Sequence, residues 1–248
     1  GIEANKFYGL TGAIAVTLKA AAAPSYLPGE FSVSATTKVK FSKGNLWYDG
    51  SAFHFETNQW GTQPASDGQW VSNHVSHFKW SDKDNAVTGD YNYSGTLFCA
   101  SNFTVDGEAG GRTLSKDEWT YLMLNRSVTN RFAKAKVNGV QGLLIFPDNY
   151  SETTSGTGIA PVNNGGAAFP TSDIPSTTWT SMESAGVVFL PAAGFRAGTD
   201  VSYVGSYGIY WSSTPLTDNA KELTFNSNEV EPQNDIYRGY GCSVRLVR

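Results

Sequence analysis

The sequence predicts an α+β fold made of small twisted antiparallel sheets, two short helices and long irregular loops. Short apolar runs separated by glycine, proline or asparagine predict buried strands, and several of them follow one another towards the C-terminus. Asn138-Gly139 lies between two further runs and is typical of a tight hairpin turn. Helix starts are indicated near Ser115 and Thr177.

The C-terminal quarter contains the clearest series of strands. The expected strands lie within residues 186–196, 207–214, 222–225 and 242–248. Because the last run reaches the C-terminus, we expect it to be hydrogen-bonded within a central sheet. The residues upstream are then expected to wrap around that sheet.

Further strands are expected upstream. Residues 31–42 alternate between apolar and polar side chains, which predicts a half-buried strand. Asp49-Gly50 is expected to turn a hairpin, and residues 143–146 form a short buried strand. Residues 57–93 and 149–172 are expected to be long loops, and long loops in compact domains are often functional.

Two helices are expected. Ser115 and Glu118 have the spacing of a capping box, in which each side chain accepts a hydrogen bond from the other residue's backbone amide. The second helix covers residues 177–185 and is followed by Gly186, a typical C-terminal cap.

The domain organisation divides the chain near Gly29. Residues 1–28 are interpreted as an N-terminal stem, or as the tail of an upstream module, and residues 29–248 as the main domain. A chain of 248 residues is long enough for one large β-rich domain with such an appendage.

Composition excludes several functions. The net charge is −4 and no stretch is strongly basic, so we expect no nucleic-acid partner. No apolar stretch approaches the roughly 20 residues that cross a bilayer as a helix, so no transmembrane segment is expected. Only 16% of residues are charged and 13% are aromatic, which suits an exported bacterial protein.

The two cysteines, Cys99 and Cys242, leave two alternatives open. They are either separate buried thiols or a disulfide that closes a long loop. No pair of cysteines has the close spacing of a structural metal site.

Several segments together resemble one bacterial family. Residues 112–119, Arg-Thr-Leu-Ser-Lys-Asp-Glu-Trp, resemble the helix start of bacterial C-type-lectin-like domains. Residues 186–196, 205–214 and 243–247 are similar to the ordered motif series of the bacterial major paralogous domain family, and residues 31–46 resemble the segment that precedes this domain in gut Bacteroidetes. The resemblance covers about Glu30 to Arg248.

The resemblance implies a C-type-lectin-like fold and an exported protein at the cell surface, anchored by lipid to the outer membrane or extracellular. It also implies adhesion or carbohydrate binding. Formylglycine-generating oxidases share this fold, but they require two reactive cysteines close together near the C-terminus. Here Cys242 stands alone in that region.

Aromatic residues in polar surroundings are the candidate ligand-binding residues. An exposed ring beside asparagine, aspartate or glutamine can stack on the apolar face of a sugar. The alternative is that most of these rings fill the core. The candidates are Trp60, Trp70, Trp80, Tyr91, Tyr203 and Tyr207.

Metal sites have weaker support in the sequence. Glu229, Glu231, Asn234 and Asp235 offer the oxygen ligands that calcium prefers, although a polar hairpin explains them equally simply. His74 and His77 lie three residues apart, but their surroundings predict a solvated loop and not a zinc site. We therefore expect no cofactor, with calcium as the alternative.

No catalytic motif is present, since the sequence contains no nucleophile elbow, phosphate-binding loop or metalloprotease helix. The sequence therefore predicts a non-catalytic surface domain whose partner is a glycan or a surface protein. The alternatives are a structural subunit of a surface fibre, suggested by residues 1–28, and an oxidase related to the formylglycine-generating enzymes.

Overall fold

The structure is a computed structural model that describes residues 25–71, 73–80, 98–128, 131–151 and 162–248. Strand makes up 40% of it and helix 11%, distributed over many small antiparallel sheets. The predicted α+β class was therefore wrong, because the protein is mostly β and has one clear helix. The prediction of small antiparallel sheets agrees with the structure.

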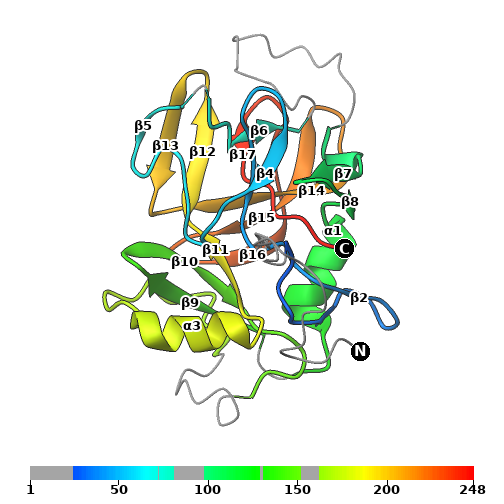
Figure 1. Ribbon diagram of the computed structural model, residues 1–248, viewed down its shortest axis with the longest axis vertical. Helices are drawn as coiled ribbons and strands as arrows, with labels where there is room; N and C mark the ends of the chain where they lie inside the picture. Colours follow the sequence, from blue (N-terminus) through cyan, green and yellow to red (C-terminus); the bar gives the residue numbers. More distant parts are fainter. Residues whose placement is uncertain (1–24, 72, 81–97, 129–130, 152–161) are drawn as a thin grey trace, which may run out of the picture.

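The largest sheet contains eight strands, and the C-terminal half of the chain supplies most of them (Figure 1). β14 and β15 are antiparallel neighbours, and β12 runs parallel to β14. The order is β16 (Val230–Tyr237), β15 (Asn219–Phe225), β14 (Gly208–Pro215), β12 (Ala193–Ala197), β13 (Asp200–Val204) and β5 (Gly68–Gln69), with β17 (Gly241–Cys242) joining β12 to β6 (Phe78–Lys79).

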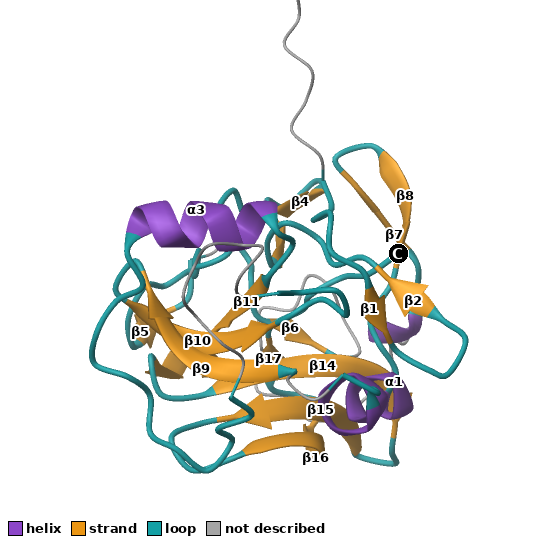
Figure 2. Cartoon of the chain, turned by 90° about the horizontal axis from the view of Figure 1, so that it is seen from below, coloured by secondary structure: helices purple, strands orange, loops and turns teal. Residues whose placement is uncertain are grey.

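A three-stranded sheet lies between this large sheet and a helix (Figure 2). Its strands are β9 (Phe132–Val137), β10 (Val140–Ile145) and β11 (Val188–Pro191), and the helix is α3 (Ser176–Ser184). Asn138 and Gly139 both have positive φ angles, 50° and 81°, so the predicted hairpin turn between β9 and β10 is confirmed.

Three two-stranded sheets complete the β structure. They pair β1 (Phe31–Ser32) with β2 (Lys38–Val39), β3 (Leu46–Tyr48) with β4 (Phe53–Phe55), and β7 (Phe103–Val105) with β8 (Glu108–Gly111). A short 3-10 helix covers Phe98–Ala100.

The helix predicted at Ser115 is short. Both hydrogen bonds of the capping box are present, and α1 (Lys116–Thr120) follows, but the backbone changes to π-helical geometry over Tyr121–Asn125. Such π segments are uncommon and interrupt regular helical hydrogen bonding. The local start was therefore predictable, whereas a second full α-helix does not form.

The apolar side chains form three buried clusters that follow the strand periodicity. Alternate side chains of a strand point to opposite faces, so the eight-stranded and the three-stranded sheet each contribute to two clusters. Tyr210, Leu223 and Phe225 face a cluster shared with β10, β11 and α1. Ile209 and Trp211 face a second cluster, shared with β3, β4 and β6. The third cluster lies between α3 and the three-stranded sheet.

The C-terminal segment is held by main-chain hydrogen bonds. Val247 is fully buried, and it bridges to Phe41 on one side and to Arg112 on the other. Lys40 and Arg248 also exchange backbone hydrogen bonds of 2.9 and 3.1 Å. The last residues are thus fixed between two earlier parts of the chain, and the segment joins the large sheet through Gly241–Cys242 and through a bridge from Ser243 to Tyr210.

The predicted stem lies mostly outside the described residues. Tyr26 and Leu27, at its end, are buried, and Tyr26 forms a bridge with Ser42. The division at residues 28 and 29 stays a prediction.

Candidate ligand-binding site

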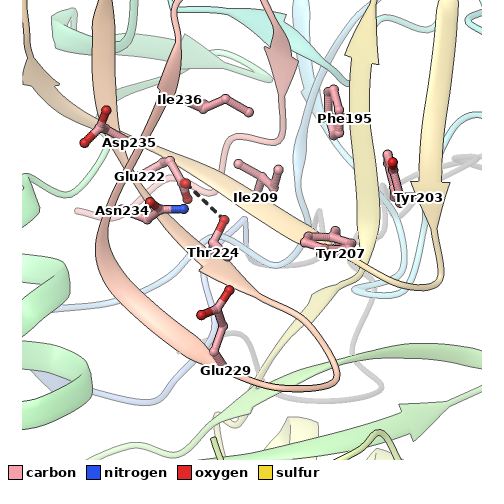
Figure 3. Close-up of a pocket in the computed structure, with 10 residues that line it drawn as sticks. All are labelled: Phe195, Tyr203, Tyr207, Ile209, Glu222, Thr224, Glu229, Asn234, Asp235 and Ile236. Carbon is pink, nitrogen blue, oxygen red and sulfur yellow. Dashed lines mark hydrogen bonds between the residues drawn. The ribbon is translucent and has the colours of Figure 1, made fainter. Parts of the chain in front are cut away.

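A pocket of about 300 Å³ opens between two walls of the large sheet (Figure 3). One wall is polar and comes from β15 and β16, and the other is aromatic and comes from β12, β13 and the turn before β14. It is lined by Phe195, Tyr203, Tyr207, Ile209, Glu222, Thr224, Glu229, Asn234, Asp235 and Ile236.

Strand register explains the polar wall. Glu222 and Thr224 are two residues apart on β15, so both side chains point to the same face of the sheet. Asn234 lies opposite Glu222 on β16, and Ile209 lies opposite Thr224 on β14. Leu223, which lies between them in the sequence, points to the other face of the sheet and packs in the cluster that contains Tyr210 and Phe225.

Three rings form the aromatic wall. The rings of Phe195 and Tyr203 are stacked, with centroids 5.6 Å apart and planes inclined by 12°. Tyr207 meets Tyr203 edge to face at 5.2 Å. Because β12 and β13 are antiparallel neighbours, Phe195 and Tyr203 project from adjacent strands. The outer ring, Tyr203, is 50% exposed.

The backbone holds Tyr203 in an unusual conformation. Its φ is +64°, a left-handed value that costs a bulky residue of order 1–3 kcal/mol. The amides of Ser206 and Tyr207 both donate hydrogen bonds of 3.0 Å to the Tyr203 carbonyl, which closes the turn that follows. Strain of this kind concentrates at functional sites, and here it lies in a ring that lines the pocket.

Glu222 is a buried acid in the polar wall. The residue is 1% exposed, and Thr224 Oγ1 donates a 3.0 Å hydrogen bond to Glu222 Oε1. The other oxygen, Oε2, is buried and has no hydrogen-bond partner. Burial, aided by the nearby Asp235 and Glu231, raises the pKa of Glu222 to about 8, although Thr224 and Asn234 oppose the shift.

Two further carboxylates line the pocket, and both have partners. Asp235 accepts hydrogen bonds from Asn219 at 2.6 Å and from Lys221 at 2.9 Å, and these contacts lower its pKa. Glu229 Oε1 accepts a hydrogen bond of 2.8 Å from Asn226. Among the residues that the structure describes, no arginine or lysine lines this pocket, and its ionisable groups are carboxyl groups and tyrosines.

The four calcium candidates are only partly brought together. Glu229, Asn234 and Asp235 line the pocket, whereas the exposed Glu231 is not among its lining residues and accepts a hydrogen bond from the Gln233 amide. Within the described residues, no three histidine, cysteine or acidic side chains gather closely enough to hold a metal ion. The calcium alternative stays a prediction.

The aromatic candidates are widely separated. Trp80 is completely buried and donates to the Ser212 carbonyl, and the half-buried Trp70 lies 3.9 Å from the Arg196 guanidinium. Trp60 lines a different pocket with Trp179, their rings 6.2 Å apart. Tyr91 lies outside the described residues. Only Tyr203 and Tyr207 share the pocket with the acidic residues.

The histidines serve local roles. His74 contacts Glu56 at 2.5 Å and stacks on Trp47, and the buried His77 contacts the Ala193 carbonyl at 2.9 Å. Desolvation lowers the pKa of His77 to about 4. The structure does not bring His74 and His77 together around a common site among the described residues.

Cys99 and Cys242 are free and buried, so of the two alternatives the structure has separate thiols. Burial raises the pKa of both thiols well above the ordinary value. A reactive cysteine depends on the opposite shift, towards the thiolate.

Sequence reasoning missed Phe195, Glu222 and Thr224. The alternation in residues 222–225, with Glu222 and Thr224 polar and their neighbours apolar, already indicates a strand with one polar face. Placing that face opposite the tyrosines required the order of strands in the sheet.

One family model matches residues 158–247, and its description is "Domain of unknown function (DUF8237)". The matched stretch includes every residue that lines the pocket. No curated protein and no solved structure matches the chain. Among the described residues, no helix has the length and apolar character needed to cross a membrane.

Proposed function

We propose that this protein is an exported cell-surface domain that binds carbohydrate, without catalysis, in the pocket beside Tyr203. The observation that carries the proposal is the pairing of an exposed aromatic ring with convergent polar groups. A sugar ring has an apolar face that stacks on an aromatic side chain and hydroxyl groups that hydrogen-bond to carboxyl and amide groups.

The geometry supports this function in two ways. Tyr203 is braced by the stacked ring of Phe195 and by the edge of Tyr207, so the platform is ordered before a ligand arrives. Asn234 and Glu229 are exposed polar groups on the opposite wall. The pocket volume of about 300 Å³ lies at the lower end of the range for small-molecule sites.

The experiment is a glycan array probed with the wild-type domain, followed by calorimetric titration of the best ligand. Tyr203→Asn removes the ring, and asparagine tolerates the left-handed backbone of this position better than most residues. We expect at least about tenfold weaker binding, equivalent to about 1.4 kcal/mol.

Tyr203→Phe is the matched control, because it keeps the ring and is expected to bind nearly as well as the wild type. Thermal unfolding of both variants checks that the fold is retained. Absence of binding to every glycan on the array, with and without calcium, would refute the proposed function.

A further inference from the structure

The ionisable side chains of the pocket favour a ligand that carries a positive charge. Three carboxyl groups line it, from Glu222, Glu229 and Asp235, and no cationic side chain does. Lys221, the neighbour of Glu222 on β15, already donates hydrogen bonds to Asp235 Oδ1 and to the Gln233 carbonyl, each of 2.9 Å. An acidic sugar would therefore meet only like charges.

Glu222 is the group whose surroundings are incomplete. Its Oε2 is buried without a hydrogen-bond partner, although Oε1 is satisfied by Thr224. A buried carboxyl oxygen left without a partner costs about 1–3 kcal/mol, and more when the group is charged. A donor that entered the pocket and reached this oxygen would recover that free energy.

A cation can interact favourably with the acidic wall and with the aromatic wall of the pocket at the same time. An ammonium group donates hydrogen bonds to carboxylates, and it is also attracted to the faces of aromatic rings. Tyr203 and Tyr207 supply such rings opposite the acidic strands (Figure 3). A neutral hydroxyl group gains the hydrogen bond but neither charge interaction.

We propose that the ligand is a sugar with a free, positively charged amino group, whose ammonium pairs with Glu222 while its ring stacks on Tyr203. This inference rests on the proposed function and adds the chemical class of its ligand. N-acetylated and neutral sugars of the same shape bind more weakly, and uronic acids are rejected.

Binding then releases a proton. The groups that face Glu222 are Asp235 and Glu231 on β16, the buried Cys242 thiol on β17, and the neutral Thr224 and Asn234. Burial first, and then the charges of Asp235 and Glu231, disfavour ionisation of Glu222, so its carboxyl group is protonated at neutral pH before a ligand binds. An adjacent ammonium favours the carboxylate, so the proton leaves as the ligand enters.

The test compares three trisaccharides by calorimetry at about pH 6, where the sugar amine stays charged: one of glucosamine, one of N-acetylglucosamine and one of galacturonic acid. Each titration is repeated in two buffers of different ionisation enthalpy, which measures protons released. We expect the glucosamine trimer to bind at least about tenfold more tightly than the N-acetylated trimer, equivalent to about 1.4 kcal/mol. We also expect a net proton release and no detectable binding of the uronate.

Glu222→Gln is expected to abolish the proton release and to reduce the preference for the amine. Asp117→Asn is the matched control, because the Asp117 side chain on α1 is 87% exposed and outside the pocket lining, and it is expected to keep both properties. The selectivity and the proton release of the wild type test the proposal even if Glu222→Gln does not fold.

The possible failures are distinguishable. Equal or tighter binding of the N-acetylated trimer, or binding of the amine without proton release, overturns the inference and leaves the carbohydrate function standing. If none of the three trimers nor any glycan on the array binds, the proposed function itself fails.

Discussion

The ionisation of Glu222 links the stability of the protein to pH. Its pKa rises from 4.5 in the unfolded chain to about 8 in the folded protein. Between these values the folded state holds a proton that the unfolded state has lost. Stability therefore falls as pH increases from about 4.5 to about 8, where the loss is complete.

We predict that Glu222→Gln removes this dependence. The free energy of unfolding of the wild type should fall by about 4 kcal/mol more than that of the variant between about pH 5 and pH 9, since each unit of pKa shift corresponds to about 1.4 kcal/mol. Urea unfolding at the two pH values measures the difference. Parallel curves for the two proteins would show that Glu222 ionises freely in the folded state.

At the scale of elements, the capping box at Ser115 fixes the start of α1. The Ser115 hydroxyl accepts a 3.2 Å hydrogen bond from the Glu118 amide, and the Glu118 carboxylate accepts a 2.8 Å hydrogen bond from the Ser115 amide. Arg112 also contacts the Glu118 carboxylate through two hydrogen bonds of 2.7 Å. Three residues thus secure a helix of only five residues.

Ser115→Ala is predicted to lower the free energy of unfolding by about 1 kcal/mol, because the Glu118 amide loses its acceptor. Ser115→Asp keeps an acceptor at the cap and should unfold close to the wild type. Chemical denaturation of the three proteins measures the effect. An alanine variant as stable as the wild type would mean that the cap contributes nothing beyond the Arg112 contacts.

Elements also show how far the sequence could predict the fold and the site. The capping box and the Asn138-Gly139 turn were predictable, because local hydrogen bonds and backbone preferences determine both. The fold class was not, because no local motif in the sequence marks the change to π-helical geometry at Tyr121. The aromatic candidates failed to converge for a related reason, since composition does not distinguish the buried Trp80 from the exposed Tyr203.

At the scale of the whole molecule, Val247 joins distant parts of the chain. Its backbone bridges Phe41 and Arg112, and its side chain is fully buried in the cluster that also contains Tyr210, Leu223 and Phe225. Removing two methyl groups from such a position costs the transfer free energy and leaves a cavity.

We predict that Val247→Ala lowers the free energy of unfolding by about 2–3 kcal/mol. Val162→Ala is the matched control, because Val162 is 58% exposed and its truncation should change stability little. Thermal unfolding of both variants makes the comparison. Equal effects of the two substitutions would show that the C-terminal segment does not close the core.

The central claim is that a ligand binds where the tyrosines meet the acidic strands, and an NMR titration of the ¹⁵N-labelled protein with the best glycan tests it most directly. We expect the largest amide shifts in residues 203–209, 222–224 and 229–236, with saturation that gives the affinity. Shifts concentrated around Trp60 and Trp179, or no shifts at saturating ligand, would contradict the account.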